Sequence, residues 1–525
     1  MPHPDPIPSA AGQPDGATAP TGEGDSAAPG AEAGRAEQAR RARGAKLARL
    51  RSAGVDAYPV GFVRSHTLAE VAHGWEGLAA DEETDDVVRV AGRIVLKRDF
   101  GRLAFWMLRQ GDDELQVMLT AAALGDDQFR LVTDLDQGDW VGAEGPVVRT
   151  RKGELSVKAT EVFLLAKSLR PLPDKWKGLT DVEVRSRQRE VDLVVNPAAR
   201  RAARLRADVL ASLRRSMVDR GYVEVETPIL QPVPGGALAR PFVTHHNALH
   251  TDLYLRVASE LYLKRLLVGG LERVFELGRM FRNEGIDARH NPEFTMLESN
   301  EAFADYRDMM RLARDVIREA ADAAVGTRRI VHPGGELDLD ADWPELPLLD
   351  AVRDAVGEPD LSYDWPLDKV RTVCDRTGVP YEPGWGTGKL VLELYEKHAE
   401  HRIVAPTFVT DYPVEVSPLA HPHRDDPYVT ERFELIILGR EYANAFSELT
   451  DPDEQRRRME EQALAKAGGD EDAMVVDEAY LRALELGLPP NAGLGIGVDR
   501  LVMLLGSLSS IREAVLFPQL RPEEL

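Results

Sequence analysis

The chain has 525 residues, of which 43% are hydrophobic and 29% charged, a balance typical of a globular protein with two or three domains. The single cysteine, Cys374, excludes an internal disulfide framework and fits a reducing, cytoplasmic compartment, and no apolar run is long enough to span a membrane. The formal net charge of −23 excludes a surface that is basic throughout, although a local basic stripe is compatible with RNA binding.

The first 60 residues fall into two parts of opposite composition. Residues 1–34 are rich in Ala, Pro, Gly and acidic residues and contain no Lys or Arg, which predicts a disordered tail, because such a segment buries too little apolar surface to offset its ordering entropy. Residues 35–60 contain a basic stretch in which Leu47 and Leu50 form one apolar stripe, which predicts a helix that ends near Gly54. Two interpretations are open: a surface helix docked through that stripe, or a helix that faces the phosphates of RNA.

Residues 61–168 predict a small β-barrel. Its expected strands are VVRVAGRIV, LAFWMLR, LQVMLT, DWVGAEGPVV and LSVKATEVFLL, and turn residues separate several of them. Five such strands are typical of an OB-fold, whose face binds single-stranded nucleic acid by base stacking and by contacts to base edges. The fold is a weak indication of function by itself, because such barrels also bind other ligands.

Residues 169–195 predict a linker, and residues 196–525 a second, larger domain. The linker contains two closely spaced prolines and three arginines that could face RNA or a second subunit: Arg185, Arg187 and Arg189. In the larger domain, Arg204–Gly221 predicts an amphipathic helix, and YVEVETP predicts an alternating strand that ends at Pro228. The glycine-rich turn that follows contains Gly236, where the backbone can approach a ligand closely.

Arg273–Tyr306 predicts two strands joined by a long charged loop. Because alternate residues of a strand share a face, Arg282 and Glu284 lie on one side of the first arm. One side of the second arm carries Phe294, Met296, Glu298 and Asn300. Arginine binds phosphate through two parallel hydrogen bonds and Phe stacks on a base, so this surface suits a nucleotide bound beside a cation. The alternative is a solvated hairpin with a charged tip.

Residues 304–405 give little indication of function. Their glycine-rich segment PGWGTGKL lacks the spacing of a phosphate-binding loop, so we expect an insertion in the larger domain. In the following hairpin, Glu431–Asp451, one face is formed by Asn444, Phe446 and Glu448. Glu434 and Glu441 do not fit that face by simple alternation. Such carboxylates suit Mg²⁺ that is also held by phosphates, or they are simply solvated.

Three segments of the larger domain, in this order, resemble the three motifs of class II aminoacyl-tRNA synthetases, in the form that lysyl-tRNA synthetases carry. Motif 1 is the helix and strand at about 204–228, motif 2 is FRNEG…RHNPEFTMLE within about 273–298, and motif 3 is GLGIGVDRLVMLL at about 493–505. LAFWML, LQVML and KGELSV resemble the anticodon-binding barrel of the same enzymes. The resemblance covers roughly residues 40–522. It implies an α+β multidomain protein in which an OB-fold precedes a catalytic domain built on an antiparallel sheet with helices, and which forms a homodimer through motif 1.

The resemblance also implies the reaction and the residues of the nucleotide site. ATP activates lysine as lysyl-adenylate, and the lysyl group then moves to the terminal ribose of tRNA(Lys). Arg282 and Arg500 are the implied catalytic residues, which hold the α- and γ-phosphates. The implied ATP-binding residues are Arg282, Glu284, Arg289, His290, Asn291, Phe294 and Arg500, with Phe294 under the adenine. Glu434 and Glu441 are the implied ligands of Mg²⁺, which requires a bulge or a register different from simple alternation.

The amino-acid pocket that the resemblance implies contains Gly236, Glu260, Glu298, Asn300, Asn444, Phe446 and Glu448. In it, Glu448 binds the ε-ammonium of lysine beside Phe446, and Glu260 binds the α-ammonium. In the barrel, the resemblance implies that Phe105 stacks on an anticodon base, while Gln116 and Glu154 contact base edges. The alternative for Phe105 is a place in the barrel core.

Two positions depart from the pattern of the lysyl enzymes. Asn300 stands where these enzymes carry a tyrosine that helps to hold the ε-ammonium, and Ser259 replaces the proline of their APELY segment. We therefore consider two alternatives to a lysyl-tRNA synthetase: a related synthetase with an altered or relaxed amino-acid pocket, and an enzyme that aminoacylates an acceptor other than tRNA. The predicted barrel argues against the second. A non-catalytic RNA-binding protein is disfavoured because the phosphate-binding residues are present.

Overall fold

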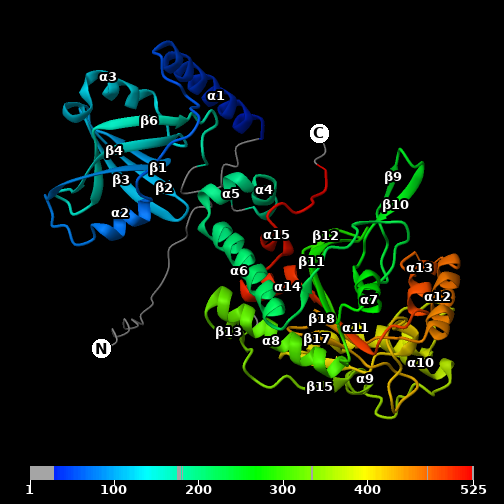
Figure 1. Ribbon diagram of the computed structural model, residues 1–525. Helices are drawn as coiled ribbons and strands as arrows, with labels where there is room; N and C mark the ends of the chain where they lie inside the picture. The colour runs from blue at the N-terminus through cyan, green and yellow to red at the C-terminus, as the bar shows by residue number, and fades with distance from the viewer. Residues whose placement is uncertain (1–28, 174–178, 180, 333–334, 470, 523–525) are drawn as a thin grey trace, which may run out of the picture. The chain divides into compact units, whose positions relative to one another are not determined.

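The computed structural model describes residues 29–173, 179, 181–332, 335–469 and 471–522. They form two compact units, which divide between Pro173 and Asp174 (Figure 1). The predicted tail lies outside the described residues as far as residue 28. Among the described residues, no helix combines the length and the apolar character that a membrane span requires.

The first unit contains a closed ring of five strands. The strands of the unit are β1 (Glu83–Asp99), β2 (Leu103–Gln110), β3 (Asp113–Thr120), β4 (Trp140–Arg149), β5 (Leu155–Ala159) and β6 (Glu161–Ala166). Its helices are α1 (Pro29–Ser52), α2 (Leu68–Gly74) and α3 (Ala121–Asp134). The ring closes because β1 pairs with both β2 and β4, in the order β1-β2-β3-β5-β4. This arrangement agrees with the predicted OB-fold. The last expected run, LSVKATEVFLL, is two strands rather than one, since it breaks at Thr160.

Helix α1 is docked on the barrel through the apolar stripe that the sequence predicts. Leu47 and Leu50 are buried in the barrel core. On the same helix, Lys46 pairs with Asp136 at 2.5 Å and Arg49 pairs with Asp134 at 2.5 Å. These contacts favour the docked helix over a helix that faces RNA. The helix begins at Pro29, earlier than predicted, because Pro is tolerated in a first turn and the Ala and Glu residues that follow are good helix formers.

The second unit is built on an eight-stranded sheet with the order β15-β16-β17-β18-β19-β12-β11-β7. Its strands are β7 (Val223–Glu224), β11 (Arg273–Phe281), β12 (Glu293–Ala302), β15 (Glu345–Pro347), β16 (Thr407–Thr410), β17 (Arg432–Ile436), β18 (Glu441–Ser447) and β19 (Asn491–Gly497). The strands from β16 to β11 are antiparallel, and both edge strands are parallel to their neighbours. This is the antiparallel sheet that the resemblance implies. The predicted motif 1 strand, which ends at Pro228, is reduced to the two residues of β7.

The remaining strands and helices complete the unit. They are β8 (Leu230–Gln231), β9 (Val243–His246), β10 (Thr251–Leu255), β13 (Arg329–His332), β14 (Gly335–Asp338), α4 (Val182–Arg187), α5 (Arg189–Val195), α6 (Pro197–Asp219), α7 (Glu260–Val268), α8 (Tyr306–Val325), α9 (Leu348–Val356), α10 (Leu367–Thr377), α11 (Thr387–His398), α12 (Pro452–Ala467), α13 (Glu478–Leu484), α14 (Val498–Leu505), α15 (Ile511–Ala514), and the 3₁₀ turns η1 (Glu400–Arg402) and η2 (Val414–Val416).

Two sets of helices pack on the large sheet. Helices α6, α8 and α14 share one core with the sheet, which includes Leu213, Ile317 and Leu501. Helix α7 packs against β11 and β12 in a different core, which contains Leu263 and Val274. One face of the sheet is therefore covered by α6, α8 and α14, and the other, which α7 covers in part, has room for a ligand site.

The predicted linker is partly helical. Helix α4 is capped by Asp181, and α5 follows directly. Its arginines pair with acidic residues of the same segment: Arg185 and Arg189 with Asp192 at 2.9 and 2.6 Å, and Arg187 with Glu183 at 2.6 Å. Sequence reasoning missed these helices because each has only six or seven residues.

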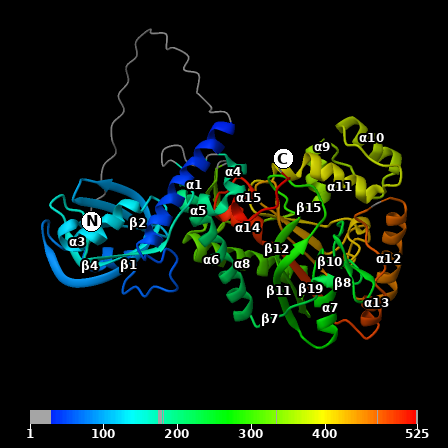
Figure 2. The ribbon, with the colours of Figure 1, turned by 90° about the horizontal axis from the view of Figure 1, so that it is seen from above.

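Helices α9, α10 and α11 form a group of their own (Figure 2), with a core that includes Cys374. The segment PGWGTGKL leads into α11, where the backbone N–H groups of Gly386 and Gly388 donate to Glu415 at 2.9 and 3.0 Å. A carboxylate of the chain itself therefore occupies the N-terminus of this helix, where an anion is favoured. This agrees with the expectation that the segment is no phosphate-binding loop.

Candidate active site

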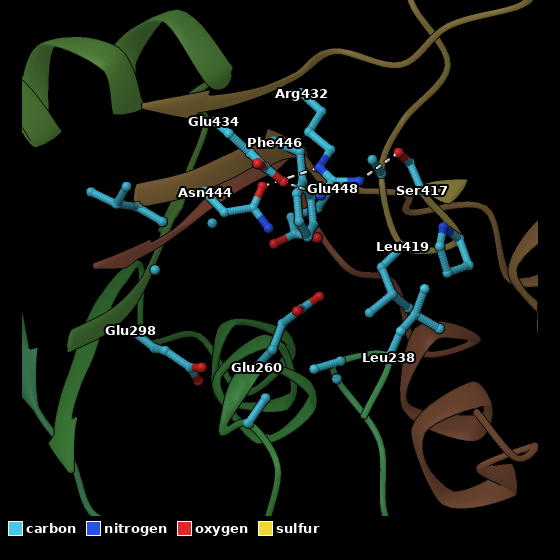
Figure 3. A pocket seen from close by; sticks show the side chains of 18 of the residues that line it. Leu238, Glu260, Glu298, Ser417, Leu419, Arg432, Glu434, Asn444, Phe446 and Glu448 are labelled. Atoms are coloured by element: carbon cyan, nitrogen blue, oxygen red, sulfur yellow. Dashed lines mark hydrogen bonds and ion pairs between the residues drawn. The ribbon is translucent and has the colours of Figure 1, made fainter. Parts of the chain in front are cut away.

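A cavity of about 290 Å³ lies over strands β12, β18 and β19, on the face opposite the long helices (Figure 3). Strand alternation builds its floor. Leu297, Ala445 and Ile496 enter the core under the helices. Their neighbours on the cavity side include Met296, Glu298, Asn444, Phe446 and Gly495. All seven predicted amino-acid-binding residues line this cavity: Gly236, Glu260, Glu298, Asn300, Asn444, Phe446 and Glu448.

A second cavity, of about 110 Å³, adjoins the first and shares Arg282, Met296 and Glu441 with it. All seven predicted ATP-binding residues line this cavity: Arg282, Glu284, Arg289, His290, Asn291, Phe294 and Arg500. The guanidinium of Arg282 lies 5.1 Å from the centre of the Phe294 ring. Its Nε is buried and has no hydrogen-bond partner within the part of the chain that the structure describes. An unsatisfied buried donor of this kind suits an anionic ligand.

The start of α14 is fixed to the floor of the second cavity by Asp499. Its carboxylate accepts a hydrogen bond from the backbone N–H of Thr295 at 2.8 Å and pairs with Arg206 of α6. The adjacent Arg500 donates to the backbone carbonyl and to the side chain of Glu441, at 2.8 and 3.0 Å. The buried anchor thus holds Arg500 beside the cavity.

The bulge that the sequence requires is present in the β17–β18 hairpin. Glu434 lies opposite Asn444, but the register shifts between Leu435 and Ile436, and Ile436 then lies opposite Glu441. Glu434 and Glu441 therefore line the same cavity as Asn444. The sequence left a bulge and a different register both open, and the hairpin has a register shift between Leu435 and Ile436.

The two acids influence each other's ionisation. Burial, and then the charge of Glu441, raise the pKa of Glu434 above its ordinary value. Burial also opposes the charged form of Glu441, but Arg500 and Arg282 outweigh it and lower the pKa of that carboxyl. No cluster of three or more His, Cys, Asp or Glu side chains suited to a metal ion occurs in the described ranges. Mg²⁺ commonly takes one or two carboxylates from a protein when phosphates supply other ligands, and Glu434 and Glu441 are two carboxylates that line this cavity.

Glu448 is bound on both of its oxygens by other side chains. Its Oε1 accepts a hydrogen bond from Asn300 Nδ2 at 2.9 Å, and its Oε2 forms an ion pair with Lys264 Nζ. Lys264 also pairs with Glu260 at 2.6 Å, one helical turn earlier on α7. A Cβ on Gly493 would lie 2.3 Å from Glu448 Oε1, so only glycine leaves room for this arrangement. Burial raises the pKa of Glu448, whereas Lys264 favours its ionised form.

Glu298 is held by the residue that departs from the pattern of the lysyl enzymes. The backbone N–H and the Oγ of Ser259 both donate to Glu298 Oε2, at 2.6 and 2.5 Å. A proline at this position has neither donor, so Ser259 adds two hydrogen bonds. Burial raises the pKa of the Glu298 carboxyl, and the two hydrogen bonds oppose this rise.

Two residues of the site were not found by sequence reasoning. Arg432 donates to Asn444 Oδ1 at 3.1 Å and to Glu434 Oε1 at 2.7 Å (Figure 3). Its guanidinium also lies over the ring of Tyr412. Lys264 joins Glu260 to Glu448. The four-residue spacing of Glu260 and Lys264 on a predicted helix was a usable signal for that pair. Arg432 gives no comparable signal, because its partners lie on both strands of the hairpin and on the segment 416–417.

The predicted anticodon residues lie on neighbouring strands of the barrel. On β2, Ala104, Trp106 and Leu108 enter the core, so Phe105 faces the other side and lies 6.3 Å from the ring of Phe100. The alternative of a core position for Phe105 is therefore not what the structure has. Gln116 is buried and donates to Ser156 Oγ at 2.8 Å, and Glu154 is exposed just before β5.

Comparisons with known proteins agree on both units. The family model of class II tRNA synthetases (D, K and N) matches residues 181–521, and the model of the OB-fold nucleic acid binding domain matches residues 88–165. A lysine–tRNA ligase of Carboxydothermus hydrogenoformans is 47% identical over 479 residues, which are 91% of this chain and 97% of that protein. The lysine–tRNA ligase of Xanthomonas campestris pv. campestris is 49% identical over 487 residues, 91% and 95% of the two chains. That of Bacillus subtilis is 45% identical over 478 residues, 91% and 96% of the two chains.

Proposed function

The chain belongs to the class II tRNA synthetases and groups there with the lysine–tRNA ligases; from this premise we propose that it attaches lysine to tRNA(Lys) through a lysyl-adenylate. The observation that carries the proposal is the junction of the two cavities at Arg282. One cavity offers guanidinium groups and the Phe294 ring, which suit ATP. The other offers acidic side chains and the Phe446 ring, which suit a lysine side chain.

Activation in this site is a matter of positioning and charge neutralisation. The carboxylate of lysine attacks the α-phosphorus of ATP in line, the adenylate forms and pyrophosphate leaves, so no side-chain nucleophile is required. Arg282 neutralises the α-phosphate, and its unpartnered Nε supports this role. Arg500 holds the γ-phosphate, while Arg289 and His290 hold the outer phosphates. A ribose hydroxyl at the end of tRNA then takes the lysyl group, and AMP leaves.

Mg²⁺ is the cofactor of this proposal, bound together with ATP. Glu434 and Glu441 fit as its ligands, because their hard carboxylate oxygens line both the amino-acid cavity and a third cavity, of about 1200 Å³, which Arg289, His290 and Arg500 also line. Arg432 and Arg500 orient these two carboxylates through direct hydrogen bonds. When bound, the ion neutralises charge on the phosphates.

Lysine is selected by buried acids in the first cavity. Glu448 binds the ε-ammonium, Phe446 packs along the aliphatic chain and Glu260 binds the α-ammonium. Gly236, Glu298, Asn300 and Asn444 complete the lining. An amino acid without a terminal ammonium would place an uncharged group against the Glu448 carboxylate and gain no charge-assisted hydrogen bond there, so neutral rivals are rejected.

The first unit reads the anticodon. Phe105 stacks on a base, and Gln116 and Glu154 contact base edges on the adjoining strands. The outward direction of Phe105 and its exposed neighbour Phe100 support this assignment.

The enzyme forms a homodimer through motif 1 and works in the cytoplasm. Support for the dimer comes from exposed apolar side chains on and near α6, β7, β8 and β9, which are Val218, Val223, Ile229, Leu230 and Val243. Exposed apolar residues gathered in one region of a chain are typical of a subunit interface. The buried free thiol of Cys374 is compatible with a reducing compartment.

The alternative of an altered amino-acid specificity rests on Asn300 and is not favoured. Asn300 supports Glu448 rather than replacing it, and the relatives compared above are all lysine–tRNA ligases. The test is ATP–pyrophosphate exchange with Mg²⁺, run separately with each of the twenty amino acids. Lysine alone should drive exchange. Exchange driven by another amino acid, or by none, would overturn the proposal.

A further inference from the structure

Lys264 is the most deeply buried charge in the candidate active site. Its side chain is 0% exposed, and its ammonium contacts Glu260 and Glu448, two of the acids that line the amino-acid cavity. Figure 3 shows the side chains of Glu260 and Glu448 pointing toward one another. The rings of Phe446 and Tyr480 lie 5.6 and 5.9 Å from the Lys264 nitrogen. The charge is thus enclosed by two carboxylates and two aromatic faces.

We propose that Lys264 is a positioning residue that keeps Glu448 ionised and oriented for the substrate's ammonium, and so sets the pH range in which the enzyme binds lysine. The inference rests on the proposed function, since it concerns the same pocket. Two buried carboxylates that share one ammonium repel each other when the ammonium is removed, and one of them then takes up a proton. A neutral carboxylic acid binds an ammonium ion far less well than a carboxylate does.

The groups around Glu448 leave Lys264 as its cationic partner. Asn300 of β12 contributes a neutral amide, Tyr480 of α13 a phenol whose pKa burial raises, and Phe446 of β18 an uncharged ring. Glu260 of α7 is a second anion, and its charge raises the pKa of Glu448 further. Among these groups in the described chain, only Lys264 carries the positive charge that opposes burial.

The same contacts fix the direction of Glu448. With Oε2 held by Lys264 and Oε1 held by Asn300, the carboxylate cannot rotate freely, and Oε1 lies against the glycine backbone at Gly493. A substrate ammonium therefore meets a carboxylate whose direction is already fixed and whose ionised form Lys264 favours against the effect of burial on its pKa. Preorganised charge of this kind requires little rearrangement at the moment of binding.

The test compares the pH dependence of the lysine KM in ATP–pyrophosphate exchange for wild type, Lys264→Met and Lys264→Arg. A carboxyl group must lose its proton to bind an ammonium ion, so binding improves as pH rises through the pKa of Glu448. Removal of Lys264 raises that pKa, so the midpoint of the Lys264→Met profile should move up by about one pH unit or more. Below that midpoint, each unit raises the lysine KM about tenfold. The ATP KM should stay near that of wild type, and Lys264→Arg should restore the wild-type midpoint.

A matched control is available in the first unit. Lys167 is also 0% exposed and pairs with two acids, Asp136 at 2.6 Å and Asp139 at 2.8 Å. Lys167→Met should lower stability but leave the pH profile of the lysine KM unchanged. Because the same substrate is titrated in every variant, its own amino groups contribute equally to all profiles.

Glu260→Gln tests the same coupling in the opposite direction and does not depend on the folding of Lys264→Met. With the neighbouring anion removed, the pKa of Glu448 falls, so the midpoint should move down even though the lysine KM rises. A folded Lys264→Met variant with the wild-type midpoint and lysine KM, or an unmoved midpoint in Glu260→Gln, would overturn the inference. Wild type that fails to activate lysine would instead overturn the proposed function.

Discussion

In the nucleotide cavity, Arg282 has a buried Nε without a hydrogen-bond partner in the described chain. In the amino-acid cavity, Glu448 accepts a hydrogen bond on Oε1, and its Oε2, which has no hydrogen-bond partner among the described residues either, forms an ion pair with Lys264. The difference follows from what each ligand brings. ATP carries several negative charges that can satisfy a waiting guanidinium. An amino acid brings a single ammonium to each acid, so a buried carboxylate must already be held by the protein, because an unpaired buried charge is costly. We call the nucleotide cavity the open half of the site, because it has a donor available for a charged ligand. We call the amino-acid cavity the paired half, because its buried charges already contact one another.

The largest effect is expected in the open half, from Arg282→Ala. Loss of one preorganised charge contact to the transition state removes about 2.7–4 kcal/mol of stabilisation, so exchange should fall about 10²–10³-fold. Arg279→Ala is a matched control on β11, three residues before Arg282, since Arg279 is half exposed and lies 3.5 Å from Glu293 outside the cavity. Near-wild-type exchange by Arg282→Ala would show that Arg282 does not stabilise the reacting phosphate, contrary to what we infer for the open half.

The paired half is tested by Glu448→Gln. A hydrogen bond to a charged group is worth about 1.5–3 kcal/mol, so the lysine KM should rise about 10–150-fold. The ATP KM should change little, because Glu448 lines the amino-acid cavity and not the nucleotide cavity. Equal increases in both constants would mean that the two halves do not act separately.

Phe105→Ala extends the comparison to the first unit. Loss of base stacking is worth about 1–3 kcal/mol, so tRNA charging should fall about 5–150-fold in kcat/KM. Lysine-dependent pyrophosphate exchange without tRNA should be unchanged. A parallel loss of exchange would show that the barrel acts on activation itself, contrary to the assignment.

The smallest effect is expected from Asn300→Ala, which sharpens the description of the paired half. One neutral donor to Glu448 is lost while Lys264 remains, and a typical hydrogen bond is worth about 0.5–1.5 kcal/mol, so the lysine KM should rise about 2–12-fold. Measured beside Glu448→Gln, an equal or larger effect of Asn300→Ala would show that the amide, and not the ion pair, organises the pocket.

Strand periodicity was sufficient to predict most of the site. Alternation on β12 placed Phe294, Glu298 and Asn300 on one face, and all three line one of the two cavities. Alternation did not predict that Glu434 and Glu441 lie on the same side as Asn444. A register shift between paired strands cannot be inferred from the alternation within either strand. The resemblance supplied those two residues instead.

The site residues that sequence reasoning missed are positioned by contacts between segments that lie far apart in the chain. Lys264 contacts Glu448, 184 residues further along the chain, and Arg432 joins Glu434 to Asn444 across a hairpin whose register was uncertain. The contribution of Ser259 was visible only as a departure from a pattern, and its two hydrogen bonds to Glu298 required the folded arrangement of α7 beside β12. A side chain whose role is to position another side chain leaves no periodic pattern in the sequence from which it could be predicted.

The most direct test of the central claim is the identity of the amino acid that the wild-type enzyme attaches to tRNA. The enzyme is incubated with ATP, Mg²⁺, total tRNA and an equimolar mixture of the twenty amino acids, and the 3′-terminal adenosine of each tRNA is then analysed by mass spectrometry. Lysine should be found, esterified to tRNA(Lys) alone. Another amino acid on the tRNA, lysine on other tRNAs to the same extent, or no ester at all would contradict the account.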